Sequence, residues 1–200
     1  MIDLYFAPTT NGMRALFAME ESGLPYTPHR LNLQAGDQKK PEFIAINPAG
    51  RIPVLVDHQG PGGKPLMLEQ SGAIALYLAE RSAALMPADP VRRVKAIQWL
   101  MSACSDAAGA VSGTFMLSAH PAAAELYKAA LQAQFALWDA RLAAQDWIVG
   151  EFSVADLAFF CIYNSRKSLI DPDGRHANLA RGSKALLARA GIARALKLAA

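Results

Sequence analysis

The chain has 200 residues, of which 52% are hydrophobic and 18% charged. This composition supplies a sizeable core for one large domain or two small ones and argues against disorder. Lys and Arg number 20 against 17 Asp and Glu, a net charge of +3 that is spread along the chain without long basic runs, so a nucleic-acid partner is not expected.

The two cysteines, Cys104 and Cys161, are far apart and form no CxxC motif, and the four histidines show no ligand spacing. We therefore expect neither a disulfide framework nor a metal site. The first five residues lack the basic and apolar regions of a signal peptide, and no apolar run has the length of a membrane span, about 18 residues. These features predict a cytoplasmic protein with no membrane partner.

The first eighty residues alternate between strand and helix patterns. Strands are predicted over 2–6, 26–33, 51–57 and 65–68, and helices over 11–22, 41–46 and 71–81. The loop over 58–63 is too long for a two-residue hairpin turn. The order is βαβ followed by αββα, which predicts parallel strands in the first half and an added hairpin in the second.

Strand patterns end near residues 85–90, and alanine becomes frequent. Asp89 and Pro90 are suited to begin a long helix that runs to about Gly113. A second helix is predicted to begin after residues 118–121 and to reach about 144, and shorter helices follow a break at 171–174. The prediction is an α/β domain over 1–81, a linker over 82–89 and an all-helical bundle domain over 90–200.

Ser153 and Asp156 have the spacing of a capping box that opens a third helix. A serine and an aspartate also occur in hydrolytic triads, but the pattern places no histidine with them. We therefore interpret this pair as structural.

Two short segments have the chemistry of a peptide-binding site. Ile52-Pro53 leads a short apolar run, and a proline that lacks a backbone donor, if cis, turns the preceding backbone outward. Gln70-Ser71 opens a helix, where unpaired N–H groups and the positive end of the helix dipole attract a carboxylate. Such a protein can hold a small peptide by its main chain at one point and by its carboxylate at another.

These segments, with three more, resemble the cytosolic glutathione transferases and, within them, the bacterial Nu-class-like enzymes. The matching segments are 4–12, 47–53, 70–74, 77–80 and 153–157. The resemblance implies a thioredoxin-like first domain, a helical second domain that forms the wall of the electrophile site, and a homodimer. It also implies glutathione as co-substrate, without a metal.

In the family the thiol of glutathione reacts as a thiolate, which nearby donors stabilise. Thr9, Thr10 and Asn11 lie between the first strand and the first helix, and the resemblance implies that Asn11 and Thr9 contact the sulfur. A Thr or Asn that merely caps the helix is the alternative. Tyr5 is a rival activator, since some classes use a tyrosine there, although packing on a neighbouring strand is its simpler role. No cysteine occupies 8–12, which argues against a cysteine-based mechanism.

The resemblance also implies the contacts to the rest of glutathione. Ile52, held by Pro53, presents its main chain to the cysteinyl part, Ser71 takes the γ-glutamyl carboxylate, and Gln70 accepts from the ammonium group. Strand alternation is expected to turn Glu69 to the opposite face. For the glycyl end the candidates are Gln38 and Arg51, whose alternative role is that of solvated polar residues.

We expect an enzyme that activates glutathione for conjugation to a small hydrophobic electrophile, for reduction of a glutathione-mixed disulfide or a peroxide, or for both. The competing hypothesis is a non-catalytic glutathione-binding or protein-interaction module of the same fold. Such a module is expected to lose the glutathione contacts, whereas Ile52-Pro53 and Gln70-Ser71 are both present.

Overall fold

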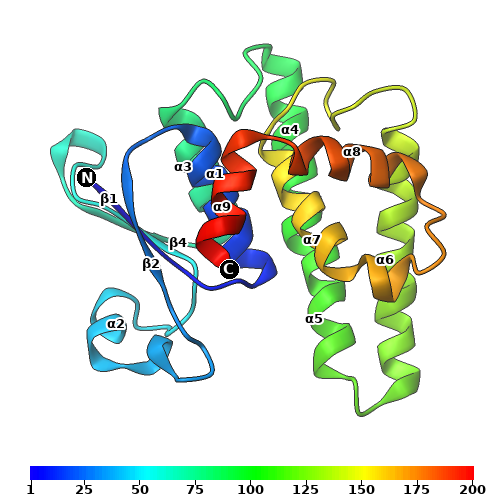
Figure 1. Ribbon diagram of the computed structural model, residues 1–200, viewed down its shortest axis with the longest axis horizontal. Coiled ribbons are helices and arrows are strands. Elements are labelled where there is room, and N and C mark those ends of the chain that lie inside the picture. The colour runs from blue at the N-terminus through cyan, green and yellow to red at the C-terminus, as the bar shows by residue number, and fades with distance from the viewer. The chain divides into compact units, whose positions relative to one another are not determined.

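The computed structural model describes residues 1–200, and by packing these fall into two compact units. The first consists of Met1–Leu85 together with Ala190–Ala200, and the second of Met86–Arg189. The sequence predicts that all of 90–200 belongs to the helical domain, whereas the last helix, α9 (Ala190–Ala199), packs with the first unit, against α1 (Thr10–Ser22) (Figure 1).

A four-stranded sheet forms the centre of the first unit. Its strands are β1 (Ile2–Phe6), β2 (Tyr26–Arg30), β3 (Val54–Asp57) and β4 (Leu66–Glu69), in the spatial order β2-β1-β3-β4. The strand β1 runs parallel to β2 and antiparallel to β3, and β3 runs antiparallel to β4. The predicted thioredoxin-like arrangement, a parallel half followed by a hairpin, is confirmed.

Two strands are shorter than the sequence predicts. The strand β2 ends at Arg30 because the chain turns after Leu31, whose N–H still donates to the Phe6 carbonyl at 2.8 Å. The strand β3 begins at Val54 instead of residue 51, since Pro53 has no N–H for the ladder. The Ile52–Pro53 peptide bond is cis.

The two faces of the sheet are covered by different helices. On one side α1 lies between α3 (Ser71–Arg81) and α9, as Figure 1 shows, and Leu4 and Phe6 of β1 are fully buried. On the other side the short helix α2 (Pro41–Ile46) inserts Phe43 into a small core with Leu31 and Val54. The period of two along each strand thus sends alternate side chains into two separate cores.

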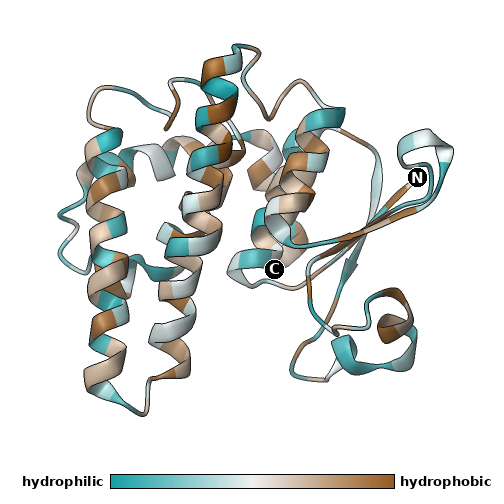
Figure 2. Cartoon of the chain, turned by 180° about the vertical axis from the view of Figure 1, so that it is seen from behind, coloured by the Kyte–Doolittle hydropathy of each residue, from teal (hydrophilic) through white to brown (hydrophobic).

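The second unit contains helices only. They are α4 (Pro90–Ser102), α5 (Ala108–Met116), α6 (Pro121–Arg141), α7 (Val154–Ile170) and α8 (Ala177–Leu187). Hydrophobic and hydrophilic residues alternate along these helices (Figure 2), and aromatic side chains such as Trp138, Phe135 and Phe159 fill the core. None of the helices combines the length and the apolar character that crossing a bilayer would require.

The predicted long helix from Pro90 is present but not regular. Asp89 caps it by accepting a hydrogen bond from the Arg92 N–H at 2.8 Å, as expected. A π-helical turn over Ala103–Ala107 then separates α4 from α5. Such a turn carries no distinct sequence signal, because it differs from the α-helix by a single shift in the hydrogen-bond pattern.

The capping box at the start of α7 is confirmed. The Ser153 side chain accepts from the helix, and the Asp156 carboxylate accepts from the N–H groups of Ser153 and Ile148, each at 2.8 Å. Both capping residues are fully buried. Burial raises the pKa of Asp156 to about 7, against the lowering effect of these donors. This aspartate fixes the turn before α7, which is a structural role.

Candidate functional site

One small cavity of about 100 Å³ gathers most of the residues that the sequence singles out. Its lining residues are Asn11, Arg51, Ile52, Pro53, Glu69, Gln70 and Ser71. They come from the start of α1, from the loop before β3 and from the junction of β4 with α3. Three segments far apart in the sequence therefore meet where α1 and α3 both begin.

The start of α3 offers unpaired donors to this cavity. Gln70 is the N-cap residue, yet its side chain makes no capping hydrogen bond. Its backbone has a φ of 70°, a left-handed value that a residue with a side chain adopts only at a cost of about 1–3 kcal/mol. The first N–H groups of α3 are therefore open, and with the helix dipole they favour an anion. Ser71, 6% exposed, adds its hydroxyl at the same point.

Glu69 also lines the cavity, contrary to the expectation from strand alternation. The reason is the left-handed backbone of Gln70, which ends the extended geometry on which the alternation rule depends. The site therefore contains a carboxylate residue beside the predicted amide.

The loop before β3 presents main-chain groups. The side chain of Asn47 holds this loop by donating to the Arg51 carbonyl at 2.9 Å and by accepting from the Ala49 N–H at 3.1 Å. Ile52 lies outside the β1–β3 ladder, which starts at Val54, and its N–H and C=O make no hydrogen bond to another main-chain group. These two groups are available to an extended peptide.

Arg14, which was not singled out from the sequence, contacts two residues that line the small cavity. It lies in the first half of α1 and is 1% exposed. Its Nη1 donates to the Asn11 Oδ1 at 3.0 Å and to the Ser71 Oγ at 2.7 Å. The signal was available, because Arg14 is a single charge inside the apolar stretch of 12–19 and lies one helical turn after Asn11.

Thr9, Thr10 and Asn11 are placed differently from one another. Thr9 is the N-cap of α1 and its Oγ1 accepts from the Gly12 N–H at 3.1 Å, so the capping role falls to Thr9. A hydroxyl that accepts in this way keeps its own hydrogen for donation. Thr10 is the first helical residue and does not line the small cavity, whereas the exposed Asn11 borders it.

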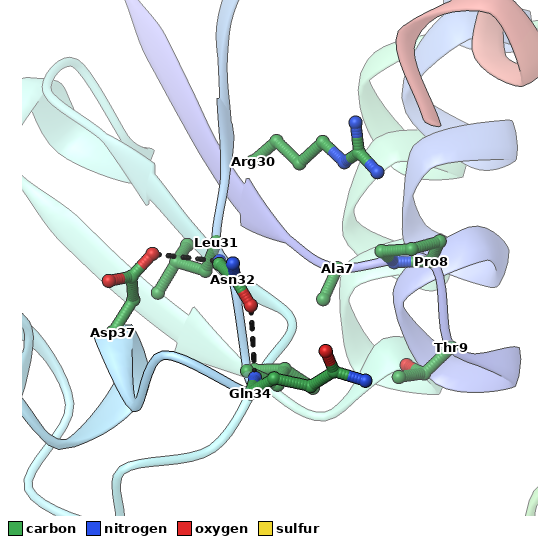
Figure 3. Close-up of a pocket in the computed structure, with 9 residues that line it drawn as sticks. Ala7, Pro8, Thr9, Arg30, Leu31, Asn32, Gln34 and Asp37 are labelled. Carbon is green, nitrogen blue, oxygen red and sulfur yellow. Dashed lines mark hydrogen bonds between the residues drawn. The ribbon is translucent and has the colours of Figure 1, made fainter. Parts of the chain in front are cut away.

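A larger cavity of about 580 Å³ begins at Thr9. Its lining residues are Ala7, Pro8, Thr9, Arg30, Leu31, Asn32, Leu33, Gln34 and Asp37. Figure 3 shows the Gln34 amide directed toward Thr9 and the Arg30 guanidinium extending toward Pro8. The segment 32–37, which follows β2, is held by Asn32. Its N–H donates to Asp37 at 2.7 Å, and its Oδ1 accepts from the Gln34 N–H at 3.0 Å. The volume lies in the range typical of small-molecule sites, about 300–1,000 Å³.

Two residues considered at the sequence level lie elsewhere. Gln38 is in a short 3₁₀ turn (Asp37–Lys39), lines neither cavity, and has a buried Oε1 without a hydrogen-bond partner. Tyr5 stacks on His29 with ring centroids 4.4 Å apart and lines a third cavity, of about 370 Å³, beneath α2. Burial raises the pKa of the Tyr5 hydroxyl.

A cluster around the buried Asp57 fixes the far end of α3. The Asp57 carboxylate accepts from the Tyr77 hydroxyl at 2.7 Å and from the Arg81 guanidinium at 2.6 Å. Burial alone would raise the pKa of Asp57, but these donors and the Arg81 charge hold it below its usual value. The helix whose first turn faces the small cavity is thereby tied to the end of β3.

The chemistry of the site is that of an anion receptor with peptide-like main-chain contacts. Two helix starts, a serine hydroxyl and an exposed amide surround one point, and Glu69 also lines the cavity. The buried Arg14 guanidinium lies against Asn11 and Ser71. No group of three or more His, Cys, Asp or Glu side chains is placed to hold a metal ion. The arrangement favours a small peptide that carries a carboxylate and an ionisable group.

Comparisons with known proteins agree with this description. The sequence model of the glutathione S-transferase N-terminal domain matches residues 10–81. The disulfide-bond oxidoreductase YfcG of Escherichia coli K12 is 38% identical over 166 residues, covering 79% of this chain and 77% of that protein. The chain therefore belongs to the glutathione S-transferase family.

Solved structures of bacterial relatives are similar over the whole chain. A glutathione transferase from Pseudomonas putida, solved with one glutathione disulfide per subunit, has a TM-score of 0.91 at 30% identity, covering 100% of this chain and 92% of that one. A family member from Pseudomonas fluorescens Pf-5, solved with two glutathione molecules, has a TM-score of 0.89 at 31% identity, covering 98% and 92%.

Proposed function

We propose that this protein is an enzyme that binds reduced glutathione, stabilises its thiolate, and uses it to reduce disulfides and to conjugate electrophiles. The observation that carries the proposal is the small cavity, in which the open start of α3, the Ile52 main chain and the Asn11 amide meet. A γ-glutamyl-cysteinyl peptide needs an anion site, an antiparallel main-chain partner and a donor for sulfur, and this cavity has all three.

The peptide is proposed to bind along the 51–53 loop. Ser71 and the first N–H groups of α3 take the γ-glutamyl carboxylate, and the oxygen of Gln70 accepts from the ammonium group. Ile52 pairs its N–H and C=O with the cysteinyl residue. Arg51 borders the same cavity and supplies a charge to a glutathione carboxylate, whereas Gln38 requires a ligand that extends beyond this cavity to reach it.

Thiolate stabilisation is assigned to the 9–11 segment. Asn11 is proposed to donate its amide hydrogens to the sulfur, and the Thr9 hydroxyl keeps a hydrogen for the same purpose. Thr10, at the first position of α1, contributes the positive end of that helix through its backbone. Tyr5 is disfavoured as the activator, because it lines a different cavity from Thr9 and Asn11.

Disulfide reduction is supported by two facts. The relative YfcG is named a disulfide-bond oxidoreductase, and the Pseudomonas putida structure holds glutathione disulfide. Cys104 and Cys161 both lie in the second unit, and the 8–12 segment has no cysteine. The two electrons are therefore proposed to come from glutathione itself.

In the proposed reaction the bound thiolate attacks the glutathionyl sulfur of a mixed disulfide. The new S–S bond yields glutathione disulfide, and the released thiolate takes up the proton that the bound thiol gave up. When the oxidant is an ordinary disulfide, the first attack forms a mixed disulfide and a second glutathione thiolate completes the reduction. The larger cavity beside Thr9 has room for this acceptor, and Arg30 supplies a cation for its carboxylate.

The assembly and location are proposals of the same kind. Large apolar side chains are exposed on the second unit, among them Phe115, Met116 and Leu126, each at least 73% exposed. Covering such a surface favours association, and we propose a homodimer that works in the cytoplasm. A small hydrophobic electrophile remains the proposed partner for conjugation.

The proposal is tested by two assays with purified protein, reduction of a small symmetrical disulfide by glutathione and conjugation of an activated aryl halide. Asn11→Ala is expected to lower kcat/KM in both about 10- to 100-fold, since a charge-assisted hydrogen bond to a thiolate contributes about 1.5–3 kcal/mol. Tyr5→Phe, which keeps the ring on His29, is the control and is expected to match the wild type. A tenfold loss in Tyr5→Phe with none in Asn11→Ala would refute the assignment.

A protein-interaction module of the same fold is the second candidate. It predicts glutathione binding without turnover in either assay. The donors at Thr9 and Asn11 argue against this candidate, because a protein that only binds glutathione has no need to stabilise its thiolate.

A further inference from the structure

The inference concerns Arg14 and rests on the proposed function. The guanidinium of Arg14 is buried in the first unit, and both of its hydrogen-bond partners, Asn11 and Ser71, are neutral groups. Its Nε and Nη2 are buried and have no hydrogen-bond partner. A charge held this far from water is costly unless something compensates it.

The two hydrogen bonds fix the direction of the groups that receive them. A guanidinium can only donate, so the Asn11 oxygen must face Arg14 and the two amide hydrogens must face away from it. In the same way the Ser71 oxygen accepts from Arg14, so its own hydrogen points elsewhere. Asn11 and Ser71 both border the small cavity, and each is thereby set to donate into it.

Without Arg14, Asn11 and Ser71 could each either donate or accept a hydrogen bond in the cavity. An asparagine amide can turn either end to a ligand, and a serine hydroxyl can accept as readily as donate. A thiolate and a carboxylate require donors only. One Nη1 nitrogen, which carries two hydrogens, therefore sets both residues in the orientation that anions need.

We propose that Arg14 is the positioning residue of the glutathione site. It holds Asn11 and Ser71 as donors at the two anionic ends of the ligand, and the bound thiolate and γ-glutamyl carboxylate supply negative charge that its own hydrogen-bond partners do not. Because Arg14 is 1% exposed, it acts through these two residues and through its field, without touching the ligand.

This arrangement couples the two ends of the ligand. Binding of the carboxylate at Ser71 places one negative charge beside the shared guanidinium, and ionisation of the thiol at Asn11 places a second. Both events draw on the same cation, so removing Arg14 must weaken carboxylate binding and raise the thiol pKa together. A residue that served only to pack α1 against α3 would change stability and leave the pKa of the bound thiol unchanged.

The test uses the full-length protein and three substitutions, Arg14→Lys, Arg14→Gln and Arg14→Met. The pKa of bound glutathione is read from the ultraviolet absorbance of the thiolate, and the binding of S-methylglutathione, which has no ionisable thiol, reports on the carboxylate end alone. Arg194→Met, which removes a surface charge of the same unit paired with Glu20, is the matched control. Circular dichroism and urea unfolding establish that each variant is folded.

For Arg14→Met we expect a rise of about one unit in the pKa of the bound thiol, a tenfold loss of thiolate, and about tenfold weaker binding of S-methylglutathione. Arg14→Lys keeps the charge and is expected to keep most of the lowering of the pKa of the bound thiol. Arg14→Gln, which keeps a donor but no charge, is expected to lose it. Arg194→Met is expected to match the wild type in both measurements.

A folded Arg14→Met with the wild-type thiol pKa and wild-type affinity would overturn the proposal. If Arg14→Met does not fold, Arg14→Lys and Arg14→Gln carry the test, and equal thiol pKa values in these two variants would overturn it. Failure of the proposed function looks different, because the wild type itself would then bind no glutathione or leave its thiol pKa unshifted, and the role of Arg14 would fall with it.

Discussion

Gly12 connects the packing of the first unit to the chemistry of the site. A Cβ built on Gly12 would overlap the carbonyl oxygen of Ala7, at the end of β1. The same carbonyl accepts from the Thr9 N–H at 2.7 Å, and the Gly12 N–H donates to the Thr9 hydroxyl at 3.1 Å. Substitution by alanine must therefore displace the segment that carries Thr9 and Asn11.

The cost of Gly12→Ala follows from these contacts. Overlap with a backbone oxygen cannot be relieved by a rotamer change, and overpacking of this kind costs about 1–3 kcal/mol. Loss of the Thr9 cap adds about 1 kcal/mol, while the better helix propensity of alanine returns about 1 kcal/mol. We expect a net loss of about 1–3 kcal/mol in the free energy of unfolding. The affinity for glutathione is expected to fall by a larger fraction than the free energy of unfolding.

The measurement is urea unfolding together with glutathione titration of Gly12→Ala. Gly109→Ala is the matched control, because Gly109 also lies in a helix, α5, and an added Cβ there meets nothing within 4 Å. It is expected to gain up to about 1 kcal/mol in stability and to keep wild-type affinity. Equal stability of the two variants would refute the close-approach argument. Unchanged glutathione affinity in a destabilised Gly12→Ala would show that the packing at Gly12 does not position the glutathione site.

Two other substitutions test the strained and the buried groups. Gln70→Gly removes the cost of the left-handed backbone and is expected to raise the free energy of unfolding by about 1 kcal/mol while weakening glutathione binding, and a loss of stability in urea would contradict this. Burial raises the pKa of Asp156 in the folded state to about 7, above the ordinary value of 3.8. The folded state therefore holds the proton more tightly, and stability falls as pH rises between these values. The free energy of unfolding is measured for the wild type and for Asp156→Asn at pH 4.5 and at pH 7.5. The wild-type value minus the Asp156→Asn value is expected to be smaller at pH 7.5. A difference independent of pH would show that the carboxyl titrates alike when folded and unfolded.

Much of the fold could be predicted because local signals and tertiary packing agree. Three elements have the predicted bounds, namely the helices 41–46 and 71–81 and the strand 2–6. The helix 41–46 begins at Pro41 and ends before Asn47. In the strand 2–6, alternate side chains enter the two cores on either side of the sheet. The bounds of β3 were misplaced because the apolar pattern continues through Pro53, whereas the hydrogen-bond ladder does not.

Features set by tertiary contact could not be predicted from the sequence. The packing of α9 on α1 brings together residues far apart in the chain, such as Arg194, which donates to the Glu20 carboxylate at 2.7 Å across 174 residues. The hydrogen bond of Arg14 to Ser71 likewise joins residues 57 apart in the chain. Helical periodicity places Arg14 on a face of α1, but only the position of α3 makes that face part of a site.

The central claim is that the cavity at the start of α3 holds glutathione and activates its thiol. The most direct test is a pH titration of the wild-type protein with reduced glutathione, followed by the ultraviolet absorbance of the thiolate. The account predicts saturable binding and a bound-thiol pKa at least about one unit below the free value of about 8.5. Saturable binding with an unshifted pKa, or no binding at millimolar glutathione, would contradict it.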